Sequence, residues 1–121
     1  MPLRLVILLV LLSGCAPPPA SEPSPPSESL GACLASAGAR LYGASWCPQC
    51  HRQLQMFDPE SADVPYTDCA PEGTVGFVSA CEQGGVPYGT TLPVWIFADG
   101  TRLYGVRDPF EIAATAGCLS P

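Results

Sequence analysis

The sequence contains no lysine, and its five arginines stand against eleven aspartate and glutamate residues. The resulting net charge of -6 excludes a surface that neutralises many phosphates, so we expect no nucleic acid as a partner. A single histidine, His51, is present, and only 13% of the residues are charged. The longest uninterrupted apolar run, residues 5–12, is far shorter than the roughly 20 residues of a membrane-spanning helix. No carboxylate pair, phosphate-binding loop or Ser/His/Asp set is recognisable.

Apolar residues nevertheless make up 47% of the 121 residues, which is enough for the core of one globular domain. Seven cysteines in so short a chain indicate an oxidising compartment or a metal site. Of the fifteen prolines, seven lie before residue 27, so the first quarter of the chain differs in composition from the rest.

Residues 1–14 are predicted to be a lipoprotein signal peptide. Arg4 precedes the apolar run, whose length suits a signal-peptide core. The run ends in Leu12-Ser13-Gly14-Cys15, which resembles the lipobox of bacterial lipoproteins. This resemblance implies that Cys15 is lipidated, inserts its acyl chains into a lipid bilayer, and holds the protein on the extracytoplasmic side of a bacterial cell envelope, in the periplasm or at the cell surface. The alternative is an ordinary secretory signal in which Cys15 is incidental.

Residues 15–28, the acceptor Cys15 and the segment after it, are predicted to be a tether. Residues 16–28 hold six prolines and no large apolar side chain, so they cannot join a core. Proline favours an extended chain, which here would reach about 40 Å. The tether would hold the following domain, residues 29–121, away from the membrane.

Residues 29–121 read as a small α/β domain with the order α-β-α-β-α-β-β-α. Helical spacing of apolar residues, capping signals and β-prone runs support this order. Thr74 is expected to cap the third helix, and Asp108 the last. The expected elements are helix 30–37, strand 40–44, a helix from Pro48 to Pro59, strand 64–69, helix 74–83, strands 94–98 and 101–104, and helix 109–116.

The chemistry is predicted to lie at Cys47-Pro48-Gln49-Cys50. Two cysteines three residues apart at a helix start lie within disulfide reach. The first faces unpaired backbone N–H groups and the positive end of the helix dipole, which stabilise a thiolate. The thiolate is the nucleophile, and in such motifs the pKa falls to between about 3.5 and 7.5. We therefore expect Cys47 to attack and Cys50 to resolve the mixed disulfide.

The surroundings of this motif resemble the active site of the thioredoxin superfamily: a strand, then Ser45-Trp46-Cys47-Pro48-Gln49-Cys50-His51, then a helix. Thr91-Leu92-Pro93 looks like the cis-proline loop of that superfamily. The resemblance implies a cis Leu92–Pro93 bond, backbone groups of Thr91 and Leu92 offered to a peptide substrate, and a peptide site shaped by Pro93. Trp46 would stand at the rim of this site, and Pro48 and Gln49 would tune the redox potential.

A narrower resemblance covers most of residues 30–118. Leu41-Tyr-Gly-Ala-Ser-Trp-Cys-Pro-Gln-Cys-His-Arg-Gln53 is similar to the thioredoxin-like domain fused to bacterial and plant vitamin K epoxide reductase homologues. The same holds for Val64-Pro-Tyr-Thr-Asp-Cys69, Ala80-Cys81, Leu92-Pro-Val-Trp95 and Gly105-Val-Arg-Asp-Pro-Phe-Glu-Ile-Ala113.

This family implies a thioredoxin-like fold with about four strands in a mixed sheet flanked by helices. It also implies an enzyme that exchanges disulfides with secreted or envelope proteins. We expect the protein to need neither metal nor cofactor. We expect a monomer, and a separate membrane protein as the electron partner. In two respects the chain differs from ordinary thioredoxin: it lacks the N-terminal strand, and Leu41 stands where thioredoxin carries a buried carboxylate used in proton transfer.

The family also suggests a role for the other cysteines. Cys69 and Cys81 match a second cysteine pair of the family. Cys33 and Cys118 then remain, and a disulfide between them would close a loop of about 85 residues, worth about 4 kcal/mol in the entropic model. Either pair could instead relay electrons to Cys47 and Cys50, although structural disulfides are the simpler interpretation.

Three other functions compete with disulfide exchange. Cys47-Pro-Gln-Cys50-His51 also spells the attachment motif of c-type haem. Two thiolates and His51 could bind copper or zinc in a metal carrier. The pair could also be a structural disulfide in a non-catalytic binding module. For His51, the alternatives are an exposed helical residue and a modulator of the cysteine pair.

Overall fold

The computed structural model describes residues 29–119. The signal peptide, Cys15 and the tether predicted from the sequence lie outside the described residues. The elements follow the expected order: α1 (Leu30–Ser36), β1 (Arg40–Gly43), α2 (Pro48–Gln55), a short 3-10 helix η1 (Ser61–Asp63), β2 (Tyr66–Asp68), α3 (Ser79–Gln83), β3 (Val94–Ile96), β4 (Arg102–Tyr104) and α4 (Pro109–Ala116). Within the described part of the chain, no helix is both long and apolar enough to span a bilayer.

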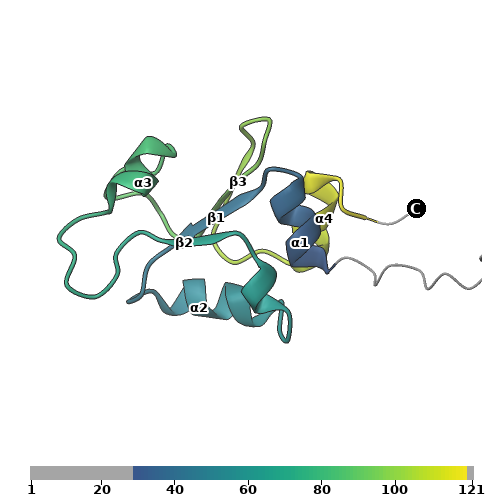
Figure 1. Cartoon of the computed structure of the whole chain (residues 1–121), viewed down its shortest axis with the longest axis horizontal. Helices are drawn as coiled ribbons and strands as arrows, with labels where there is room; N and C mark the ends of the chain where they lie inside the picture. Colours follow the sequence, from purple (N-terminus) through teal and green to yellow (C-terminus); the bar gives the residue numbers. More distant parts are fainter. Residues whose placement is uncertain (1–28, 120–121) are drawn as a thin grey trace, which may run out of the picture.

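The four strands form one mixed sheet in the order β2-β1-β3-β4. Strands β1 and β2 are parallel, whereas β1 with β3 and β3 with β4 are antiparallel. Figure 1 shows the helices placed around this sheet. The sheet begins with β1, after α1, and no strand precedes it among the described residues. The predicted fold class, a thioredoxin-like α/β fold with a four-stranded mixed sheet, is therefore confirmed.

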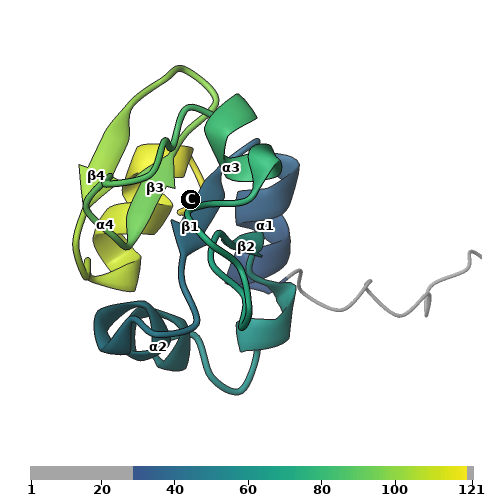
Figure 2. The same ribbon diagram turned by 90° about the vertical axis from the view of Figure 1, so that its left-hand side faces the viewer.

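The strands divide the core into two parts because neighbouring side chains point to opposite faces of the sheet. Leu41 lies opposite Trp95 in the register, and both are fully buried with residues of α1 and α4. Tyr42 lies opposite Val94, and both pack on the other face with Cys81 of α3. Helix α3 stands apart from α1, α2 and α4 in Figure 1, and in the turned view of Figure 2 it lies at the opposite end from α2.

The ends of the first and last helices follow the local sequence signals. The Ser29 hydroxyl accepts a hydrogen bond from the Ala32 N–H at 3.1 Å and caps α1. Asp108 accepts one from the Phe110 N–H at 2.7 Å and caps α4. Gly117 ends α4 with a φ of 79°, a left-handed conformation that glycine adopts without steric cost.

The expected helix over residues 74–83 is wrong in its first half. Helix α3 begins only at Ser79, with Val78 as its N-cap, so Thr74 caps no helix. Gly76 has a φ of 73°, which breaks a right-handed helix at that point. Val75 is 97% exposed, so no packing favours a helix here either. Residues 70–78 form instead a loop between β2 and α3.

Candidate active site

The Cys47–Cys50 motif lies where the chain leaves β1 and enters α2. Cys47 is the N-cap of α2, and its Sγ accepts a hydrogen bond from the Cys50 N–H at 3.2 Å. Pro48 occupies the first turn, where a missing N–H costs nothing. The N–H donor and the positive end of the helix dipole both stabilise negative charge on the Cys47 sulfur. This arrangement favours Cys47 as the nucleophile.

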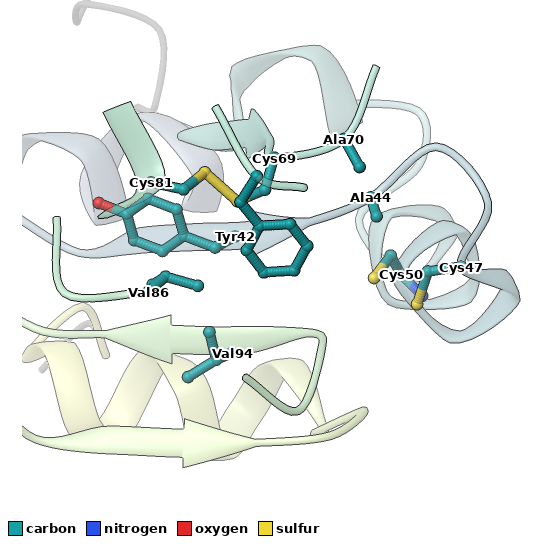
Figure 3. Packing of buried hydrophobic residues seen from close by; sticks show 10 residues of the cluster. Tyr42, Ala44, Cys47, Cys50, Cys69, Ala70, Cys81, Val86 and Val94 are labelled. Carbon is teal, nitrogen blue, oxygen red and sulfur yellow. A yellow bond between two sulfur atoms is a disulfide. The ribbon is translucent and has the colours of Figure 1, made fainter. Parts of the chain in front are cut away.

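Cys47 and Cys50 are free thiols in the structure, whereas the other four described cysteines form disulfides. In Figure 3 the two sulfurs lie close together without a bond. Cys50 is fully buried, and this burial raises its thiol pKa to about 12. A hydrogen bond with the Cys47 thiol and the negative charges of Cys47 and Asp68 add to the rise. Cys50 is therefore held as a protonated thiol.

Trp46, the residue before Cys47, has 64% of its surface accessible, whereas Cys47 itself is only 4% exposed. We call this exposed side chain the Trp46 ridge. Two grooves have Trp46 in their lining. One, of about 450 Å³, is lined by Ser45, Trp46 and the loop residues Ala70, Pro71, Glu72, Gly73 and Thr74. The other, of about 240 Å³, is lined by Trp46, Phe77, Tyr88, Gly89 and Thr90. Both grooves are open and share Trp46, the residue before Cys47, so a peptide segment has room to lie beside Trp46.

The proline loop lies between α3 and β3. The Leu92–Pro93 peptide bond is cis, and Pro93 is buried. Leu92 packs against the core cluster that holds Cys47 and Cys50, while Thr91 is exposed. The structure thus places Leu92 against the same core cluster as the two thiols and leaves the preceding residue, Thr91, exposed.

The other residues expected at the site are more peripheral. Pro48 and Gln49 are exposed on the first turn of α2. The His51 Nε2 lies 2.9 Å from the Ser45 carbonyl oxygen, so its ring is directed at the loop before Cys47. Within residues 29–119, no group of three or more histidine, cysteine or acidic side chains is arranged to hold a metal ion.

Two disulfides link segments of the domain that are separate in the sequence. Cys69–Cys81 joins the end of β2 to α3, and both residues are fully buried in the same core cluster as Cys47 and Cys50 (Figure 3). It closes the loop whose residues 70–74 line the larger groove. Cys33–Cys118 joins α1 to the residue after Gly117, across 85 positions of sequence. It lines a separate pocket with Phe110.

Three residues that surround Cys50 are not predicted from the sequence. A Cβ on Gly43 would lie 2.8 Å from both the Cys50 Sγ and the Tyr66 hydroxyl oxygen, so only glycine fits between them. Asp68 lies next to Gly43 in the register of β1 and β2. Its carboxylate accepts hydrogen bonds from the Ser45 hydroxyl and, at 3.1 Å, from the Ser45 N–H. The pairing of β1 with β2 was the signal that could have identified these residues.

No protein-family model matches the chain. The chain is similar to the thiol-disulfide oxidoreductase LTO1 of Arabidopsis thaliana, with 34% identity over 101 residues. The similar region covers 80% of this chain but 26% of the plant protein, so the chain spans about a quarter of the length of this curated relative.

Proposed function

We propose that the protein is a thiol–disulfide oxidoreductase that exchanges electrons between Cys47–Cys50 and cysteines of other proteins. The observation that carries the proposal is the contrast between the two thiols. The Cys47 sulfur receives an N–H donor at a helix N-terminus, whereas Cys50 is fully buried one turn further in. The first is suited to attack a substrate and the second to complete the exchange. The similarity to a thiol-disulfide oxidoreductase supports the same reaction.

In the reducing direction, the Cys47 thiolate attacks one sulfur of a substrate disulfide. A Cys47–substrate disulfide forms, and the other substrate sulfur leaves as a thiolate. Cys50 then loses its proton and attacks the Cys47 sulfur, so the Cys47–Cys50 disulfide forms and the second substrate sulfur leaves. The substrate gains two electrons and the protein loses two. The oxidising direction is the reverse of these steps.

The substrates we propose are secreted or envelope proteins with accessible cysteines. An extended segment of such a protein would lie along the Trp46 ridge, against the backbone of Thr91 and Leu92 and near Pro93. The two open grooves that Trp46 lines support this placement. We expect a monomeric protein to be sufficient for this reaction.

We further propose that the domain works at a bacterial membrane, on its extracytoplasmic side, anchored through lipid on Cys15. This part of the proposal is supported by the resemblance of residues 12–15 to a lipobox and by the proline-rich segment that follows. A separate membrane protein would then exchange electrons with Cys47–Cys50.

The reduction potential of Cys47–Cys50 tests the proposed function. The full chain is equilibrated with glutathione buffers, and the trapped thiols are counted by mass spectrometry. A value near -120 mV, typical of strong oxidases, or near about -270 mV, typical of thioredoxin, would support exchange and indicate its direction. A pair that stays oxidised well below about -300 mV would be a structural disulfide, and the protein would then be a binding module.

Replacing Trp46 with alanine is expected to lower kcat/KM toward an unfolded protein disulfide about tenfold. An aromatic side chain that a bound peptide covers contributes roughly 1.5–3 kcal/mol, and about 1.4 kcal/mol corresponds to a factor of ten. The rate with oxidised glutathione should change far less, because so small a disulfide does not reach the grooves. Both rates are measured by following the consumption of the reduced protein.

Phe110→Ala is the matched control for this variant. Phe110 is also an exposed aromatic residue, 69% accessible, but it lies in the pocket beside Cys33–Cys118. Its loss should leave both rates unchanged. If Trp46→Ala and Phe110→Ala have the same effect on the protein substrate, the Trp46 ridge is not the substrate surface.

A further inference from the structure

The second half of the proposed exchange needs a route for a proton. Cys50 attacks as a thiolate, but it is fully buried, and burial, the largest cause, raises its thiol pKa, so the thiolate is disfavoured at neutral pH. The ionisable groups that act on Cys50 are Cys47 on its own helix and Tyr66 and Asp68 on β2. Cys47 is consumed in the mixed disulfide at this stage. His51 is directed at the Ser45 carbonyl instead.

Tyr66 reaches Cys50 through the space that Gly43 leaves open. The Cys50 Sγ and the Tyr66 hydroxyl oxygen each lie 2.8 Å from the point where a Gly43 Cβ would stand, so they are separated by at most twice that distance. Tyr66 is half-buried and packs against the core cluster that contains Leu41. Burial, and then the neighbouring Cys50 and Asp68, raise the Tyr66 pKa, so its hydroxyl stays neutral and can both donate and accept a proton.

Asp68 is a charged group that acts on both Cys50 and Tyr66. Tyr66 and Asp68 are two residues apart in β2, so their side chains lie on the same face of the strand. The Asp68 carboxylate is held by the Ser45 N–H and hydroxyl and by the Ala70 N–H, the last at 2.9 Å. Ser45 is exposed and Asp68 is half-buried, so a proton that arrives at the carboxylate has access to water.

We propose that Tyr66 and Asp68 form the relay that removes the proton of Cys50 when it resolves the mixed disulfide. This inference rests on the proposed function. The Cys50 proton passes to the Tyr66 oxygen as the Tyr66 hydroxyl proton passes to Asp68, which releases it to water. The Cys50 sulfur forms a bond to the Cys47 sulfur, the bond from Cys47 to the substrate sulfur breaks, and the substrate thiolate leaves with the electron pair.

The relay is tested with the reduced full chain and a chromogenic aromatic disulfide, dithiobis(nitrobenzoate), in a stopped-flow instrument. Attack by Cys47 releases one coloured thiolate at a rate proportional to the reagent. Resolution by Cys50 releases the second at a rate independent of the reagent. One trace therefore measures the proposed function in its first phase and the relay in its second.

Tyr66→Phe should leave the first phase unchanged and slow the second about a hundredfold at neutral pH, the lower end of what positioned acid–base groups contribute. Without the relay, hydroxide must remove the proton, so the second phase should accelerate about tenfold per pH unit and approach the wild-type rate at high pH. Asp68→Asn retains an oxygen for the Ser45 and Ala70 N–H groups, and should show the same pH-dependent loss. The double variant should be no slower than either single variant, because both residues serve one route.

Tyr42→Phe is the matched control. Like Tyr66→Phe, it removes a tyrosine hydroxyl, but from the neighbouring strand β1 and on the opposite face of the sheet. There the Tyr42 hydroxyl lies against Gly84. Both phases should stay at wild-type rates. A second phase that is unchanged in Tyr66→Phe, or slowed by the same factor at every pH, would overturn the relay while leaving the proposed function intact. A wild-type protein without the first phase would overturn both.

Discussion

Replacing Cys47 with serine is expected to reduce disulfide exchange to the rate of the buffer alone. A serine hydroxyl does not ionise at neutral pH, so the attacking thiolate is lost. The fold should survive, because the serine oxygen can accept the Cys50 N–H that the Cys47 Sγ now accepts at 3.2 Å, and serine is a favoured N-cap. Reduction of insulin or another protein disulfide measures the activity, and thermal unfolding measures the fold.

Two further variants make this result specific to the chemistry. Cys47→Ala removes the thiol and also the cap, so it should lose activity equally and cost about 1 kcal/mol of stability in addition. Cys50→Ser keeps the attacking thiol but cannot resolve, so it should accumulate a mixed disulfide with the substrate that mass spectrometry detects. Residual exchange in Cys47→Ser, or a mixed disulfide on any other cysteine, would contradict the role of Cys47.

The elements that could be predicted from the sequence are those whose signals are local. Asp108 lies next to the helix it caps, and Gly117 directly follows α4. The helix expected from Thr74 failed because capping residues are also common in turns, and the left-handed conformation of Gly76 is set by the path of the loop between β2 and α3. The residue spacing within 74–83 does not distinguish a threonine that caps a helix from a threonine in a turn.

In the active site, too, residues with local signals can be predicted and residues brought together by strand pairing cannot. Cys47 and Cys50 were found because their chemistry depends on a spacing of three residues at a helix start. Tyr66 and Asp68 lie more than fifteen positions further along the chain and reach Cys50 only through the parallel register of β1 with β2. Such a register depends on packing of the whole sheet. It is therefore visible in the structure and not in the local sequence.

Removing the Cys33–Cys118 disulfide is expected to have the largest effect on stability. The bond spans 85 residues of sequence, whereas Cys69–Cys81 spans 12. In the entropic model a loop of the longer kind contributes about 4 kcal/mol and one of the shorter kind about 3 kcal/mol, because the longer bond restricts more of the unfolded chain. Four kcal/mol is a large share of the roughly 5–15 kcal/mol that stabilises a whole domain.

The double variant Cys33→Ala with Cys118→Ala should therefore unfold at a urea concentration about 2 M lower, for a typical dependence of about 2 kcal/mol per molar. Where it is folded, it should exchange disulfides at the wild-type rate, because Cys33–Cys118 lines a pocket that shares no residue with the grooves beside Trp46. Cys69→Ala with Cys81→Ala should behave differently: it frees the loop over residues 70–74 and should slow exchange with protein substrates as well. An unchanged urea midpoint without Cys33–Cys118 would show that this bond does not stabilise the fold, and a loss of exchange in the folded variant would point instead to electron relay through it.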